Sequence, residues 1–99
     1  MSIVIVGGHD RMVRQYMDIC KCFKCKAKVF TQMPADFKNK IGRADLMVLF
    51  TNTVSHKMVS GAVQEAKKNN IPMVHCHSSS SCALKRILEN NLWLKVRFN

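Results

Sequence analysis

Near the start of the chain stands Ile3-Val4-Ile5-Val6-Gly7-Gly8, a run of β-branched residues that ends in two glycines. This pattern predicts a short buried strand followed by a tight turn. Asp10, two positions after Gly8, is placed to cap a helix that reaches about residue 22. Apolar residues at helical spacing give that helix one buried stripe, formed by Met12, Tyr16, Ile19 and Phe23. A strand followed by an amphipathic helix is the first half of a βαβ unit, which implies parallel strands.

The same alternation continues along the chain. Further strands are expected at residues 27–31, 46–50 and 71–75. Short helical patterns separate them, one starting at Pro34 and stopped by Gly42, and one capped by Thr53 or Ser55. A last helix follows the serine run at 78–81. The sequence therefore predicts a single small three-layer α/β domain over residues 1–99, Rossmann-like or flavodoxin-like, with a parallel sheet of four or five strands. Residues 92–99 alternate from residue 94 onward and are expected to form an edge strand or a tail.

Composition narrows the possible partners. The 99 residues carry a formal net charge of +10, which suggests a polyanion such as nucleic acid. Several lysines stand where helices end, however, and cations there offset the helix dipole. No recognition motif accompanies the charge, so nucleic-acid binding is possible but not favoured.

The chain has no apolar run of the roughly 20 residues that a membrane span needs. With no signal peptide at its start and with 5 cysteines, an odd number, we expect a cytoplasmic protein with reduced thiols and no membrane partner.

All four histidines stand where a predicted strand gives way to a helix or loop. His9 follows the first strand, His56 follows the third, and His75 and His77 close the fourth. In an open parallel sheet these strand ends lie at one edge, where such folds bind ligands. Histidine is the commonest metal ligand. The sequence therefore predicts a ligand or metal site at this edge.

Cations and hydroxyl groups accompany these histidines. Arg11 and Lys57 lie in the first turns of two predicted helices, and Ser55 precedes the second of them. Ser78 and Ser79 add hydroxyl donors before the last helix. Helix N-termini bind phosphate and carboxylate groups through unpaired N–H groups. An anion site without metal, of the phosphate or nucleotide type, is therefore the main alternative.

Enzymatic chemistry has little support. The chain has only 6 acidic residues, and Asp10 alone falls at the histidine edge, so paired-carboxylate hydrolysis is not indicated. A nucleophilic cysteine with histidine remains open, because Cys76 and Cys82 flank the serines. The three thiols Cys20, Cys22 and Cys25 lack the second ligand pair of a structural zinc site. We expect Cys22 and Cys25 to be reactive beside lysines in the turn after the first helix.

Four blocks of the chain resemble a group of small bacterial proteins catalogued as domain of unknown function 2325. The blocks cover residues 4–11, 28–34, 49–58 and 77–80. The most specific of them contains Thr53-Val54-Ser55-His56-Lys57-Met58. The resemblance extends to about residue 90 and implies a single parallel α/β domain. It also implies haem binding, with dimers forming the pocket.

Transferred position by position, the resemblance marks His9, Arg11, His56 and His77 as site residues. His9 or His56 would be the axial ligand of the iron, and Arg11 would hold a propionate. Met12, Met17, Met33 and Met58 are candidates for a soft apolar wall. The function we predict is binding of haem, or otherwise of a transition metal or another small ligand, by a homodimer that senses, stores or transfers it. The alternatives are an anion-binding regulatory domain and, less favoured, a basic adaptor for nucleic acid.

Overall fold

The computed structural model describes residues 2–32, 36–42 and 44–98, and the side chains of residues 38 and 91–98 lie outside that description. The strands are β1 (Ser2–Val6), β2 (Lys26–Phe30), β3 (Leu46–Phe50) and β4 (Met73–Cys76). The helices are the 3-10 turn η1 (Asp10–Met12), α1 (Val13–Cys22), α2 (Phe37–Ile41), α3 (His56–Lys68) and α4 (Ser81–Phe98).

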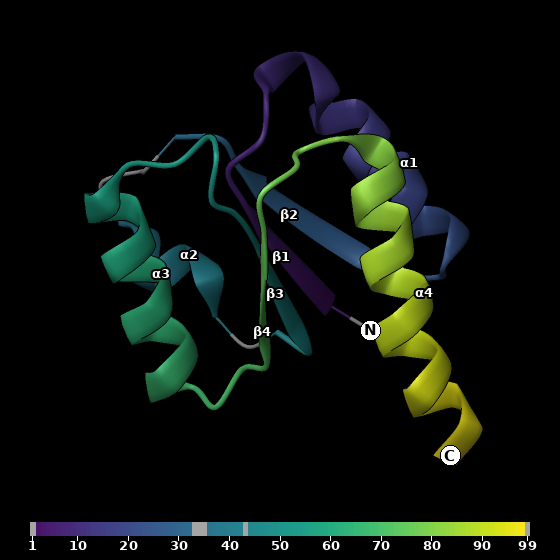
Figure 1. The fold of residues 1–99 in the computed structure, drawn as a ribbon. Helices are drawn as coiled ribbons and strands as arrows, with labels where there is room; N and C mark the ends of the chain where they lie inside the picture. The colour runs from purple at the N-terminus through teal and green to yellow at the C-terminus, as the bar shows by residue number, and fades with distance from the viewer. Residues whose placement is uncertain (1, 33–35, 43, 99) are drawn as a thin grey trace.

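The four strands form one sheet in the order β2-β1-β3-β4, and every neighbouring pair is parallel. Val6 of β1 lies in register with Phe30 of β2 and with Leu49 of β3. Helices α1 and α4 cover one face of the sheet, while α2 and α3 cover the other (Figure 1). The predicted three-layer α/β fold is therefore confirmed, and its parallel sheet has four strands.

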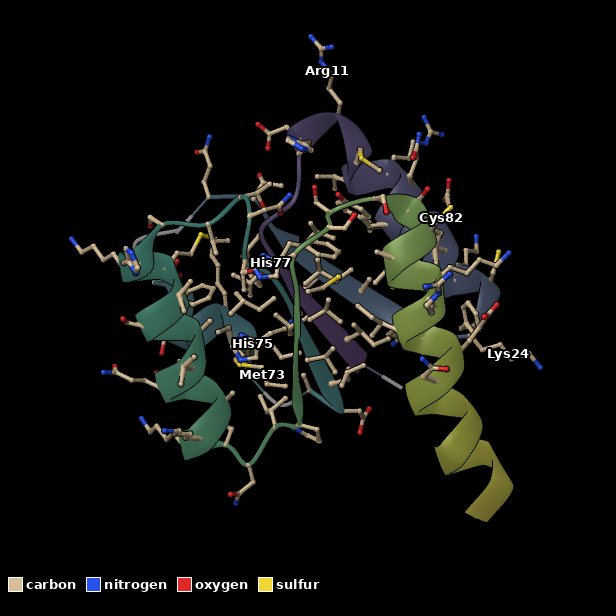
Figure 2. The ribbon with its side chains drawn as sticks, viewed as in Figure 1. Arg11, Lys24, Met73, His75, His77 and Cys82 are labelled. Carbon is tan, nitrogen blue, oxygen red and sulfur yellow. The ribbon has the colours of Figure 1, made fainter. Side chains whose placement is uncertain are left out.

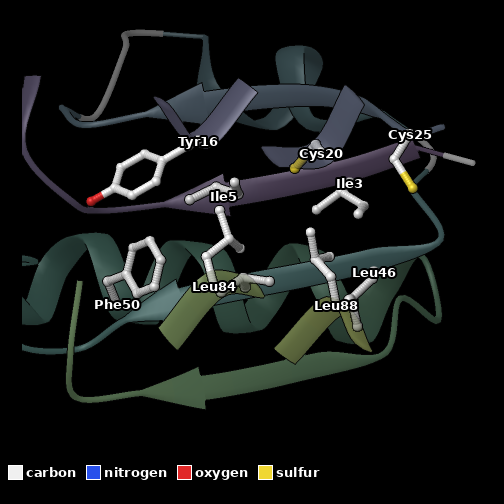
Figure 3. Packing of buried hydrophobic residues seen from close by; sticks show 10 residues of the cluster. Ile3, Ile5, Tyr16, Cys20, Cys25, Leu46, Phe50, Leu84 and Leu88 are labelled. Atoms are coloured by element: carbon white, nitrogen blue, oxygen red, sulfur yellow. The ribbon is translucent and has the colours of Figure 1, made fainter. Parts of the chain in front are cut away.

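Two apolar cores explain why the central strands are apolar throughout. The first lies between the sheet and α1 with α4, and it includes Ile5, Tyr16, Phe50 and Leu84 (Figure 3). The second lies between the sheet and α2 with α3. All five residues of β3 are buried, because alternate side chains enter the two cores in turn.

Two glycines after β1 form a tight turn that lies close to Val54 and Tyr16. Gly7 and Gly8 have φ angles of +100° and +89°, which residues with a Cβ rarely adopt. A Cβ on Gly8 would lie 2.7 Å from Cε2 of Tyr16, and one on Gly7 would lie 2.7 Å from Cγ1 of Val54. The predicted tight turn is therefore present, and both backbone angle and space require glycine there.

The structure corrects two local predictions. Residues 92–98 do not form an edge strand, since α4 continues through them to Phe98. No proline or glycine interrupts residues 81–98, so the helix extends residue by residue once it has begun. Asp10 does not cap the first helix either, because its carboxylate accepts a hydrogen bond from Thr31 Oγ1 and His9 occupies the N-cap position of η1. Pro34 lies outside the described residues.

One helix end and one helix start are as predicted. Gly42 follows α2 with a φ of +58°, and Ser55 is the residue that caps α3.

Within the described part of the chain, no helix has both the length and the apolar character needed to cross a membrane.

Candidate functional site

The carboxyl ends of β1, β3 and β4 meet at one edge of the sheet and are joined there by hydrogen bonds. The N–H of Gly8 donates to Oγ1 of Thr53 at 2.6 Å, which connects the loops after β1 and β3. The hydroxyl of Tyr16, from α1, donates to the carbonyl oxygen of Ser79 at 2.5 Å. Burial raises the pKa of Tyr16, and hydrogen bonds with the backbone at His9 and with Ser79 act in the opposite direction. The neutral hydroxyl therefore links α1 to the loop after β4.

His9 stands at this edge beside a surface hollow. The hollow measures about 540 Å³ and is lined by His9, Asp10, Arg11 and Met12. The carbonyl oxygen of His9 accepts from the N–H of Met12 at 2.9 Å, which closes the turn that forms one wall. Sδ of Met12 also lies 3.6 Å from the hydroxyl of Tyr16. The backbone around the hollow is thus held by the same tyrosine that joins the loops.

Two side chains of the hollow are free to bind a ligand. His9 and Arg11 are exposed, and neither side chain has a hydrogen-bond or ion-pair partner among the described residues. Arg11 extends from η1 away from the sheet (Figure 2). Asp10 differs, because Thr31 already donates to its carboxylate. The hollow therefore has an exposed histidine and an exposed arginine in its lining, both without a partner among the described residues.

His56 and its neighbours occupy a separate place at the same edge. The hydroxyl oxygen of Ser55 accepts from the N–H of Met58 at 3.2 Å and so caps α3. His56 and Lys57 are exposed in the first turn of that helix. Because α3 covers the opposite face of the sheet from α1 (Figure 1), His56 comes from a different layer than His9. The hollow beside His9 is not lined by His56.

The two histidines around the end of β4 differ from each other. Nδ1 of His77 lies 3.3 Å from Oγ1 of Thr51, at the end of β3. His75 lies in register with Leu49 and is exposed on the edge strand. Figure 2 shows His77 nearer the carboxyl edge and His75 beside Met73. Among the described residues no hydrogen bond joins any two histidines.

The serine run is used mainly to build the loop and begin α4. The hydroxyl of Ser78 donates to that of Ser80 at 3.0 Å, and the Ser80 hydroxyl oxygen accepts from the N–H of Ala83 at 3.2 Å. Ser79 is buried, with 6% of its surface exposed. Ser78 remains exposed at the edge. The serine run therefore serves mainly to cap α4. Of its two predicted site residues, Ser78 is exposed to solvent and Ser79 is buried.

The methionines separate into different places. Met12 lines the hollow, whereas Met58 is buried in the core under α3. Met17 is exposed on α1 and lines a different groove, beside β2. Met33 lies outside the described residues. Of the described methionines that the sequence suggested as a ligand wall, Met12 alone lines this hollow.

Tyr16, Thr53 and Thr51 form hydrogen bonds at this edge that the sequence does not predict. The sequence pattern places Tyr16 only in an apolar stripe and Thr53 only at a possible helix cap. A tyrosine in the predicted buried stripe is a usable signal, because a buried tyrosine hydroxyl normally finds a partner. The two threonines follow a buried strand, where a hydroxyl readily bonds to nearby backbone.

The three cysteines at the end of α1 and in the turn after it differ in burial. Cys20 and Cys25 are buried. Burial, together with the neighbouring Cys25, raises the pKa of Cys20 to about 11. Burial is also the main cause that raises the pKa of Cys25. The expectation of a reactive Cys25 is therefore wrong, whereas Cys22 is exposed. No group of three or more His, Cys, Asp or Glu side chains suited to a metal ion occurs in the described residues.

The reason for this burial is the turn that ends α1. The N–H of Cys25 donates to the carbonyl oxygen of Cys20 at 2.9 Å, and the N–H of Lys24 donates to that of Lys21 at 2.9 Å. Lys24 has a φ of +59°. This is the Schellman arrangement, which brings the residues at its two ends into apolar contact. Here these residues are the two cysteines.

A sequence model described as "uncharacterized protein conserved in bacteria (DUF2325)" matches residues 2–91. The chain belongs to this family. The match covers β1 to most of α4, and it includes all four histidines and Arg11, so the resemblance found in the sequence is confirmed. No curated protein and no solved structure matches this DUF2325 chain.

Proposed function

We propose that this DUF2325 chain binds haem at the hollow beside His9 and serves in sensing, storage or transfer. The observation that carries the proposal is the hollow of about 540 Å³, whose lining includes His9, Arg11 and Met12. Each of these side chains suits one part of haem: an imidazole can ligate the iron, a guanidinium can bind a propionate, and a methionine can contact the ring.

The donor set favours haem over a bare transition metal. A metal ion held only by the protein needs three or four side-chain ligands, and the described residues contain no such group. A porphyrin brings four nitrogen ligands of its own, so one imidazole is enough to fix the iron. His9 is the candidate with free ring nitrogens beside a hollow.

Arg11 is the candidate partner for a propionate. Its side chain is unpaired among the described residues and lies two positions from His9. A guanidinium can bind a carboxylate through two parallel hydrogen bonds. Substitution of Arg11 is expected to weaken haem binding without changing which atom ligates the iron.

The open shape of the hollow supports a homodimer. A hollow on the surface covers one face of a flat ligand and leaves the other exposed. A second copy related by a two-fold axis would cover that second face. His56, exposed at the start of α3, is a candidate second axial ligand from such a copy.

A cytoplasmic location suits this assignment. All five cysteines are free thiols, and free thiols persist in a reducing compartment.

Titration with ferric haem tests the proposal. We expect the Soret band of haem to sharpen and shift as protein is added, with saturation at a fixed ratio of haem to chain. His9→Ala is expected to abolish the shift, and Arg11→Gln to weaken the apparent affinity about tenfold. His75→Ala is the matched control, because His75 is also exposed but lies on β4. A wild-type spectrum identical to that of free haem would refute the proposal.

An anion site without haem is the second candidate, because Arg11 is unpaired at the edge where α3 and α4 begin. Both helix starts already have serine caps, Ser55 and Ser80, which reduces their capacity for a ligand. This candidate predicts that inorganic phosphate raises the melting temperature and that Arg11→Ala removes the effect.

A further inference from the structure

The outer edge of β2 carries unpaired backbone groups. Among the described residues β2 pairs with β1 alone, on the other side of the strand. The carbonyl oxygen of Phe30 accepts from the N–H of Gly7, so Phe30 and Lys28, two residues earlier, direct their backbone groups toward β1. In a parallel pair these directions alternate along the strand. Ala27 and Val29 therefore direct their N–H and C=O groups outward.

A groove runs along this edge and has walls from both helical layers. It measures about 440 Å³, and β2 forms its floor. Val13 and Met17 of α1 form one wall, and Asn39 and Lys40 of α2 form the other. Met17 is 47% exposed and is the only large apolar side chain so exposed among the described residues. The groove has the form of a slot for one further strand.

The two faces of β2 present different chemistry to such a strand. Ala27 and Val29 pack against the core under α1. Lys26 and Lys28 are exposed on the face toward α2. The ammonium of Lys28 donates to the carbonyl oxygen of Lys40 at 3.2 Å, so its charge is held at the groove. The Lys40 ammonium is itself paired with Asp36 at 3.5 Å. Among the side chains that the structure describes on this face, Lys26 and Lys28 are therefore the cations offered to an incoming strand.

We propose that the β2 edge binds an extended segment of another protein as a fifth strand, with apolar and acidic residues alternating along that segment. Side chains of a strand point to opposite faces in turn. The apolar set of the segment would lie beside Val29 and Met17, and the acidic set beside Lys26 and Lys28. Main-chain hydrogen bonds to the groups of Ala27 and Val29 would give affinity, and the two faces would give selectivity.

Charge argues against a second copy of this chain as the occupant. Pairing two β2 edges would bring lysines against lysines, and cations on an edge strand prevent such self-association. The same lysines attract carboxylates. Nucleic acid is disfavoured because the outward N–H and C=O groups match a peptide backbone, which has both donors and acceptors. Since the β2 edge is formed by other residues than the His9 hollow, this inference is independent of haem.

Binding of synthetic peptides tests this proposal directly. The probe is a capped, fluorescently labelled eight-residue peptide of alternating valine and glutamate, followed by anisotropy. Two control peptides are a block peptide, with the same composition but four valines followed by four glutamates, and an alternating peptide of valine and lysine. We expect the first peptide to bind at least tenfold more tightly than either control. Equal binding of the block peptide would mean charge attraction alone and would overturn the proposal. A labelled single-stranded oligouridylate that binds more tightly than the peptide would overturn it as well.

Two variants locate the site. Val29→Pro removes an outward N–H and leaves the ladder to β1 intact, since proline is tolerated on an edge strand when its nitrogen faces outward. We expect it to weaken peptide binding at least tenfold, whereas Val29→Thr, which keeps the N–H, binds within about threefold of the native chain. The double substitution Lys26→Glu with Lys28→Glu should abolish binding of the glutamate peptide and permit that of the lysine peptide. Lys67→Glu with Lys85→Glu makes the same change of charge elsewhere and should leave binding unchanged.

Amide hydrogen exchange gives a readout that does not depend on substitution. The amides of Ala27 and Val29 should exchange quickly in the free protein and slowly with the valine–glutamate peptide bound. The amide of Lys28, which faces β1, should be slow in both states. Protection confined to another strand would contradict the proposal.

Discussion

The hydroxyl of Tyr16 donates to the carbonyl oxygen of Ser79 at 2.5 Å, across 63 positions of the chain. This bond joins α1 to the loop between β4 and α4, and the ring of Tyr16 covers Gly8. The loops that carry His9 and His77 are therefore held to one buried side chain. The position of the histidine edge depends on this contact.

Tyr16→Phe is expected to lower the free energy of unfolding by about 1–3 kcal/mol, because it leaves the Ser79 carbonyl without its partner. The aromatic contact with Phe50, whose ring centroid lies 5.4 Å from that of Tyr16, is kept. Urea denaturation measures the change. An unaltered midpoint would show that the hydrogen bond contributes nothing to stability.

Gly8→Ala should destabilise the fold more than Gly42→Ala. Both glycines have positive φ, so each substitution has a backbone cost of about 1–2 kcal/mol. At Gly42 a Cβ meets nothing within 4 Å, whereas at Gly8 it would lie 2.7 Å from the Tyr16 ring. Thermal unfolding of the two variants gives the comparison. Equal losses would mean that the ring moves aside without cost.

Thiol labelling should separate the cysteines by burial. Cys22 and Cys82 are exposed and Cys20 and Cys25 are buried. Iodoacetamide is expected to modify the first pair in the native protein, and the second pair only after denaturant is added. Mass spectrometry of the digested protein identifies the sites. Rapid native modification of Cys25 would contradict its burial at the end of α1.

Stability should fall as pH rises from about 9 to 11. The folded state raises the pKa of Cys20 from 9.0 to about 11, so the unfolded chain loses this proton first. The contribution of the neutral thiol is thus complete below pH 9 and is lost as pH approaches 11, by about 1–2 kcal/mol. Urea denaturation across this range should show a smaller slope with pH for Cys20→Ala. Tyr16 is present in both proteins, so its contribution cancels in the comparison. Identical slopes would contradict the assignment.

Local features of the fold could be predicted from the sequence, whereas contacts between distant segments could not. The apolar runs of β1 and β3 predicted buried parallel strands, and Gly42 and Ser55 marked helix ends by their own chemistry. The Tyr16–Ser79 bond joins distant segments, and no local pattern contains it. The turn at Lys24 places a lysine where glycine is usual, so the burial of Cys25 was not evident.

The candidate site was predicted in part. The carboxyl ends of the four strands share one edge of the sheet, as predicted. Which layer of helices carries each histidine depends on the strand order, and this order places η1 and α3 on opposite faces of the sheet. The tail at 92–98 was ambiguous, since five alternating residues suit a strand while good helix formers suit continuation of α4. In the sequence, the exposed lysines Lys26 and Lys28 indicate only positive charge, because their proposed role depends on β2 being an edge strand.

The central claim is that the imidazole of His9 binds haem iron, and one set of absorption spectra tests it most directly. Equimolar ferric haem is added to the wild type, to His9→Ala and to His75→Ala at the same protein concentration. We predict that the wild type and His75→Ala give the same shifted Soret band, and that His9→Ala gives the spectrum of free haem. A shifted band that persists unchanged in His9→Ala, or one absent from the wild type, would contradict the claim.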